Sequence, residues 1–305
     1  MRGRHPGLGL ATGADPRMTP LRTAALTGVA MLAFAANSLL CRLALEQAAI
    51  DAASFGTLRL LSGSLVLGAI LRLRSGPARA ARADWIAAVM LWAYVACFSF
   101  AYLRLAAGTG ALILFGAVQL TMFAVGLWAG ERFTAMAWAG LALALGGLVY
   151  LVSPGIAAPA ASSAALMATA GIAWGIYSLR GRGAGDPVAA SAGNFLRAAP
   201  LALALSVCFA STLQASSAGI ALAIASGAVT SGLGYVVWYA ALPGLSALRA
   251  ATVQLSVPPL AAFGGVLLLS EALSPRLLLS SAAILGGVAL VLFSRSIDAQ
   301  PVQAE

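Results

Sequence analysis

Two glutamines and two arginines lie inside apolar runs, where a polar side chain must find a partner. Gln119 and Gln254 each stand in the tripeptide Val-Gln-Leu, and their amides could hydrogen-bond a solute in a shared cavity. Arg59 and Arg197 could each hold an anionic group through the guanidinium. The glutamines could equally bond between helices and fix their packing. For the arginines a structural role is favoured, such as reaching to headgroups, because one solute need not present two anions.

Aromatic side chains at helical spacing could line the same site. Trp174 and Tyr177 are three residues apart and therefore share one helix face. Tyr235 begins a similar face with Trp238 and Tyr239. Near the ends of membrane spans, such faces are also typical of the interfacial aromatic belt. The candidate substrate-binding residues are Gln119, Gln254, Asn37, Trp174, Tyr177, Tyr235 and Phe98.

A bend is expected beside one of the glutamines. Pro258 and Pro259 follow Gln254 by one helical turn, and proline removes a backbone donor from a helix. The bend could serve as a gate or could be a static kink. Asn194 joins the two arginines as a structural or anion-contacting candidate.

The composition of the chain is that of a membrane protein. It is 61% hydrophobic and only 9% charged, whereas soluble domains have roughly 25% charged residues. A spanning helix needs about 20 mainly apolar residues. The segments that meet this requirement are 22–43, 52–71, 85–104, 108–129, 134–152, 164–180, 189–210, 218–241, 247–270 and 275–294. The predicted fold is all-α, an integral membrane protein with ten transmembrane helices.

The arginines predict how these helices cross the membrane. With a cytoplasmic N-terminus, thirteen of the 18 arginines fall inside, and only Arg42, Arg104 and Arg276 fall outside. Positively charged residues prefer the cytoplasmic side, so both termini are predicted to be cytoplasmic. Five spans in each half is an odd number, so the second half must enter from the opposite side. We therefore expect two inverted five-helix repeats, at 22–152 and 164–294, with cytoplasmic tails at 1–21 and 295–305.

Landmarks of the first half recur in the second in the same order. The pairs are Arg59 with Arg197, Gln119 with Gln254, and Glu131 with Glu271. With the Gly-Glu-Arg turn at 130–132, the Ser-Glu-Ala-Leu-Ser turn at 270–274 and the Gly-Gly pairs that follow each turn, the chain resembles the EamA-type members of the drug/metabolite transporter superfamily over about residues 22–294. The resemblance implies an inner-membrane carrier of small organic metabolites, such as amino acids or amphipathic compounds, working by alternating access and in export.

The sequence carries no motif for catalysis or for a cofactor. It has no phosphate-binding Gly-Lys-Ser/Thr loop, and its single histidine, His5, stands in the N-terminal tail, away from any metal-ligand spacing. We expect no enzyme activity, cofactor or nucleic-acid partner. The expected partners are a small-molecule metabolite and the lipid bilayer, with monomer or homodimer left open. The alternative is a non-transporting membrane scaffold or a lipid-modifying membrane protein.

Overall fold

The structure, a computed structural model, describes residues 19–74, 84–128, 130, 133–155, 158–181, 185–245, 250 and 253–298, and these residues form helices without a strand. The longer helices are α1 (Pro20–Glu46), α2 (Ala52–Leu73), α3 (Trp85–Ala101), α4 (Ala107–Trp128), α5 (Ala135–Val152), α6 (Ala161–Gly181), α7 (Pro187–Cys208), α8 (Ser217–Ala225), α9 (Gly234–Ala241), α11 (Val257–Leu269) and α12 (Pro275–Asp298). A π-helix, η2 (Ser226–Leu233), joins α8 to α9, and short 3-10 helices lie at η1 (Ala210–Thr212) and η3 (Leu242–Gly244). Glu131 lies outside the described residues.

The predicted all-helical membrane fold is confirmed in its coarse form. Seven of the described helical stretches are long and apolar enough to cross a membrane: Pro20–Glu46, Ala52–Leu73, Ala107–Trp128, Ala135–Val152, Pro187–Cys208, Ser217–Gly244 and Pro275–Phe293. Two apolar helices, α3 and α11, are shorter. The count of ten spans stays a prediction.

Two of the predicted spans are less regular than the sequence suggests. The eighth is divided into α8, η2 and α9, so a π-helical segment stands in its middle. In the ninth, the chain turns at Leu255 and Ser256, and α11 begins at Val257. Pro258 and Pro259 therefore lie in the first turn of a helix, where the missing N–H groups would have no helical partner in any case. A role for them as a gate stays a prediction.

Aspartates fix where several helices begin. Asp51, Asp84 and Asp186 each precede a helix in extended conformation and accept hydrogen bonds from N–H groups of its first turn. These N–H groups have no partner within the helix, so a capping carboxylate stabilises the start. Asp84 also accepts from Arg180 Nε at 2.8 Å, which ties the start of α3 to the end of α6.

The Asp84 contacts predict a pH dependence of stability. Burial alone would raise the pKa of the Asp84 carboxyl, but the hydrogen bonds from Arg180 and from the Ala87 backbone outweigh burial and hold the pKa below its ordinary value of 3.8. A lowered pKa in the folded state stabilises the protein above that ordinary value, and this contribution is lost as the pH falls through the lowered pKa. We expect Asp84→Asn to destabilise the protein by up to about 1 kcal/mol at neutral pH, because the pair is partly exposed.

Thermal unfolding of the purified protein in detergent, measured at neutral pH and below pH 3.8, checks this expectation. The difference between the wild type and Asp84→Asn should shrink at the lower pH. An equal difference at both pH values would contradict it.

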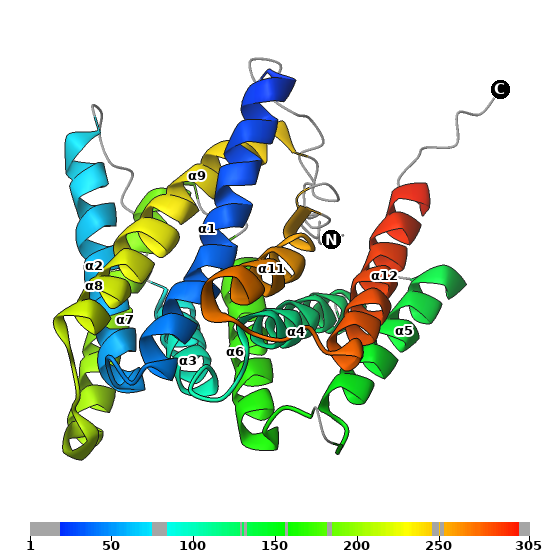
Figure 1. The fold of residues 1–305 in the computed structure, drawn as a ribbon. Coiled ribbons are helices and arrows are strands. Elements are labelled where there is room, and N and C mark those ends of the chain that lie inside the picture. Colours follow the sequence, from blue (N-terminus) through cyan, green and yellow to red (C-terminus); the bar gives the residue numbers. More distant parts are fainter. Residues whose placement is uncertain are drawn as a thin grey trace.

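The helices pack in a pattern that links the two halves of the chain. In Figure 1, α5 and α12 lie side by side at the right, and α2, α7 and α8 lie together at the left. Between these groups, α4 packs against α6 and α11, α3 packs against α6, and α1 packs against α9 and α11. Most of these contacts join a helix before residue 152 to one after residue 161.

Glycines permit the close approach of α5 and α12. A Cβ atom added to Gly140 would stand 2.5 Å from the carbonyl oxygen of Gly287, and one added to Gly287 would overlap the carbonyl oxygen of Gly140. Gly147 meets Ala283 in the same interface. By contrast, an added Cβ at Gly146 or Gly286 would have no atom within 4 Å. Within each Gly-Gly pair, only the second glycine is needed for packing.

Candidate functional site

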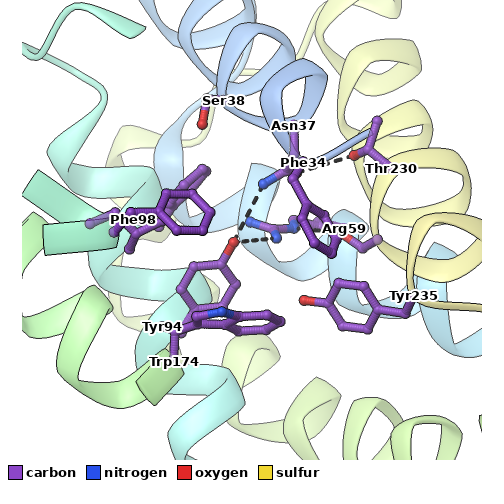
Figure 2. A pocket seen from close by; sticks show the side chains of 12 residues that line it. Phe34, Asn37, Ser38, Arg59, Tyr94, Phe98, Trp174, Thr230 and Tyr235 are labelled. Atoms are coloured by element: carbon purple, nitrogen blue, oxygen red, sulfur yellow. Dashed lines mark hydrogen bonds between the residues drawn. The ribbon is translucent and has the colours of Figure 1, made fainter. Parts of the chain in front are cut away.

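A small cavity lies where the two halves of the chain meet. The first half supplies side chains from α1, α2, α3 and α4, and the second half supplies them from α6, η2 and α9. The lining residues are Phe34, Asn37, Ser38, Arg59, Tyr94, Phe98, Leu114, Phe115, Trp174, Thr230, Ser231 and Tyr235. Figure 2 shows most of these side chains pointing toward one another around Arg59. An apolar enclosure with a few convergent polar groups is the usual form of a small-molecule site.

Arg59 is the centre of the polar contacts in this cavity. Its side chain is buried, with 1% of the residue exposed. Nε donates to the Ser231 hydroxyl at 3.1 Å, and Nη2 donates to the Tyr94 hydroxyl at 2.9 Å. The guanidinium carbon also lies 5.0 Å from the ring centre of Tyr94 and 5.1 Å from that of Phe98. The cation is therefore held by neutral hydroxyls and by the faces of aromatic rings.

Asn37 joins α1 to α3 and to the π-helix. Its side-chain nitrogen donates to the Tyr94 hydroxyl at 3.4 Å. Its oxygen accepts from the hydroxyls of Ser226 and Thr230, at 2.7 and 3.2 Å. A buried amide in an apolar helix requires such partners, because an unsatisfied polar group costs about 1–3 kcal/mol. This network fixes η2 against α1 and so places Thr230 and Ser231 at the cavity.

The π-helix is also held against α2 by a glycine. An added Cβ at Gly227 would overlap the Ser62 hydroxyl and the backbone carbonyl of Arg59. Only glycine allows this approach, and it brings Ser231 within hydrogen-bonding distance of the Arg59 side chain. Widened π-helical turns within a helix are frequent at functional sites.

Aromatic rings form the remaining wall. Trp174 lies 4.9 Å from Tyr94 and 5.3 Å from Tyr235, measured between ring centres. Phe34 meets Tyr235 edge-on at 6.1 Å. In Figure 2 the hydroxyl of Tyr235 points toward the space beside Arg59. The wall therefore combines apolar ring faces with a few polar tips.

The structure brings some of the predicted residues to this cavity. Asn37, Phe98, Trp174 and Tyr235 all line it, as does Arg59, which the sequence favoured as structural. Tyr177 is buried beside Trp174, but its hydroxyl donates to Ser191 at 3.4 Å and it is not among the lining residues. Substrate binding by these residues stays a prediction.

The structure does not place the two glutamines in this cavity. Gln119 lines a second cavity, between α4, α5 and α12. Phe123, Leu141 and Val288 are among its other lining residues. Gln254 donates to the backbone carbonyl of Ala250, four residues earlier in the chain. A glutamine whose amide already donates to a nearby backbone carbonyl has less need of a solute, so the geometry favours the structural alternative for Gln254.

The two arginines of the repeat have different surroundings. Arg197 is only half-buried on α7, and its guanidinium lies beside the backbone of Gly193 on the same helix. Asn194 is buried at 7% exposure but, like Arg197, is absent from the cavity lining. The two arginines that the predicted repeat pairs therefore differ in burial, and of the two only Arg59 lines the cavity.

Tyr94, Ser231 and Thr230 are functional candidates that sequence reasoning missed. Tyr94 carries one signal that could have identified it, since it stands in the middle of the span 85–104, away from the interfacial belt. The two small hydroxyl residues carry no distinctive signal, because serine and threonine are common in membrane helices. Their importance follows from the π-helix, which the sequence did not predict.

A second polar cluster lies at one end of the bundle. The Glu271 carboxylate accepts from the backbone N–H of Ala107, the first residue of α4, at 2.9 Å to each oxygen. Arg42 Nε donates to the same carboxylate at 3.3 Å, and Arg42 also pairs with Glu46. Burial raises the pKa of Glu271 above its ordinary value, although Ala107 and Arg42 partly offset this effect. This carboxyl group therefore holds a proton more tightly than an exposed glutamate.

Among the residues that the structure describes, no group of three histidine, cysteine, aspartate or glutamate side chains could hold a metal ion. The side chains that line the central cavity offer hydrogen bonding, the charge of Arg59 and aromatic faces.

Known proteins resemble this chain in sequence and in fold. The EamA-like transporter family matches residues 161–293. An uncharacterized protein of Pseudomonas aeruginosa is 56% identical over 278 residues, which are 91% of this chain and 97% of that protein. A solved crystal structure superposes with a TM-score of 0.64 at 20% identity, covering 91% of this chain and 99% of that chain. The similarity to this solved structure is one of fold alone.

Proposed function

Because the chain belongs, through residues 161–293, to the EamA-like transporter family, we propose that it carries a small organic metabolite across the cell inner membrane by alternating access. One observation carries this proposal. The cavity with the buried polar groups is lined from both halves of the chain, so movement of one half against the other would open it. The cavity is small in this arrangement, and admission of a solute requires the helices around it to separate.

The helix contacts support an inverted repeat with bounds 22–152 and 164–294. Exchanging the halves pairs α1 with α6, α2 with α7, α3 with the α8–α9 segment, α4 with α11, and α5 with α12. Under this exchange the contact of α3 with α6 becomes that of α1 with α9, and the contact of α4 with α6 becomes that of α1 with α11. The contacts of α2 with α7, α4 with α11 and α5 with α12 map onto themselves. Such a pattern is expected of two repeats related by a twofold axis.

Ion pairs between the two halves of the chain could close the path to the cavity at each end of the helix bundle. At the end that the arginine distribution predicts to be cytoplasmic, Arg74, which follows α2, pairs with Asp186, which precedes α7, at 3.3 Å. At the same end, Arg180 on α6 pairs with Asp84, which precedes α3. At the opposite end, Arg42 and Glu271 join α1 to the segment between α11 and α12. Alternating access requires the closures at one end to separate while those at the other end hold.

The proposal is tested by joining the two halves covalently at the cytoplasmic end. Arg74→Cys and Asp186→Cys are introduced together into a chain whose own cysteines are replaced, and the pair is joined with a reducible bifunctional thiol reagent. Counterflow of a broad panel of metabolites is then measured in proteoliposomes. We expect saturable counterflow before joining, its loss after joining, and its return on reduction.

The single variant Arg74→Cys, treated with the same reagent, is the matched control and should keep its counterflow. Counterflow that continues in the joined protein would contradict alternating access through this interface. Absence of saturable counterflow for every solute, with folded protein in the liposomes, would favour the non-transporting scaffold.

A further inference from the structure

We propose that Arg59 is the anchor for a carboxylate, and that the transported solute is an organic acid with a single carboxylate and an aromatic or apolar body. This inference rests on the proposed transport function, and it assigns a substrate class to the same cavity. It is carried by the unsatisfied charge of Arg59 and by the chemistry of the wall around it.

The charge of Arg59 has no counter-ion among the described residues. The ion pairs recorded there involve Arg42, Arg74 and Arg180, all at the ends of the bundle. Arg59 is 1% exposed and is surrounded by Tyr94, Phe98 and Ser231, which are neutral. Removing a guanidinium from water without a partner charge is costly, and neutral hydroxyls offset only part of that cost. A buried unpaired cation that lines a cavity is therefore a site for an anion.

The donors of Arg59 are only partly used. An arginine has five N–H donors. Nε and Nη2 each donate once, to Ser231 and to Tyr94, whereas Nη1 is buried and has no hydrogen-bond partner. A carboxylate can accept from both terminal nitrogens of a guanidinium at once, in parallel bonds. The free donors are thus suited to a carboxylate, while the two occupied donors hold the guanidinium in place.

The position of Arg59 limits the solute to one anionic group. Its counterpart in the proposed repeat, Arg197, lies outside the cavity lining, and no other arginine of the described residues lines the cavity. The remaining wall is formed by Phe34, Trp174 and Tyr235, whose ring faces suit an apolar or aromatic body. A doubly charged acid would have to bury its second charge against these rings, which is unfavourable.

The test compares acids with neutral compounds of the same shape. The probes are benzoate, phenylacetate and 3-phenylpropionate, each paired with its primary amide. Binding to the purified full-length protein in nanodiscs is measured by thermal shift, in buffers of low and of high chloride concentration. For at least one pair we expect the acid to bind at least tenfold more tightly than the amide.

Variants locate the effect at Arg59. Arg59→Gln should lose the preference for the acid, and Arg59→Lys should keep part of it because the charge remains. Arg197→Gln, the matched change at the other arginine of the repeat, should retain the full preference. A cooperative thermal unfolding transition of Arg59→Gln without any ligand shows that this variant is folded.

Three results would overturn the inference: equal binding of acid and amide in every pair, no saturable shift with any of the acids, or an acid preference that survives in Arg59→Gln. A shift caused by chloride and not increased by any acid would overturn it as well, since the site would then hold only an inorganic ion.

Counterflow distinguishes failure of the acid assignment from failure of the transport function. Counterflow of neutral solutes alone would support the transport function and overturn the assignment of an organic acid. Acid binding without any counterflow would support the binding site and overturn the transport function.

Discussion

Replacing Gly227 with alanine is expected to abolish transport and to destabilise the protein by about 1–3 kcal/mol or more. The added Cβ would overlap the Ser62 hydroxyl and the backbone carbonyl of Arg59 on α2. The backbone of a helix cannot move aside locally, so the π-helix must retreat from α2. Ser231 would then lose its 3.1 Å hydrogen bond to Arg59, and the guanidinium would lose one of its two fixed contacts.

Thermal unfolding in detergent and counterflow in proteoliposomes measure the two effects of Gly227→Ala. The matched control is Gly68→Ala on α2, because an added Cβ at Gly68 would have no atom within 4 Å. This control should be as stable as the wild type and equally active. If Gly227→Ala behaved like Gly68→Ala, the close contact of η2 with α2 would not be needed to position the cavity.

Replacing Gly287 with alanine is expected to separate α12 from α5, with a loss of stability of about 1–3 kcal/mol. The added Cβ would overlap the carbonyl oxygen of Gly140 and would stand 2.6 Å from the backbone nitrogen of Ala144. Small residues let membrane helices approach closely, and van der Waals contact is a main source of their association in lipid. Loss of this contact therefore weakens the α5–α12 pair directly.

The neighbouring residue gives a control for Gly287→Ala with the same chemical change. Gly286→Ala adds a Cβ with no atom within 4 Å and should leave the unfolding temperature unchanged or slightly raised, since alanine favours the helix. Both variants can be compared in one thermal unfolding experiment in detergent. Equal stability of the two variants would show that α5 and α12 do not depend on this close approach.

Several features of the cavity could be predicted from residue type and position in a span. Asn37 is a polar residue within the first apolar segment, and Trp174 and Tyr235 belong to aromatic faces; all three line the cavity. In lipid a polar group away from the interface, such as an amide or a tyrosine hydroxyl, needs a partner, so its presence alone is informative. Tyr94 meets the same criterion but is not among the candidate residues proposed from the sequence.

The glutamines and the arginines show where this reasoning ends. The predicted repeat pairs Arg59 with Arg197, yet Arg59 is buried at the cavity while Arg197 is half-buried on α7. Gln119 lines a separate cavity, and Gln254 bonds within its own segment. Equivalent position in a predicted repeat indicates only that two side chains lie at a similar depth in the bilayer. It does not fix the rotation of the helix or the identity of the facing residues, and these decide whether a polar group meets a cavity.

The sequence by itself determined the class of this protein: an all-helical membrane protein of the EamA-like transporter family, with a family match over residues 161–293. Hydropathy and charge carry that information because the bilayer acts on each segment separately. Only the tertiary structure decided which polar groups meet. Asn37, Arg59, Tyr94 and Ser231 come from four segments far apart in the chain, and they converge through a π-helix and the close contact at Gly227. Such convergence depends on helix rotation and on packing distances, which no single segment encodes.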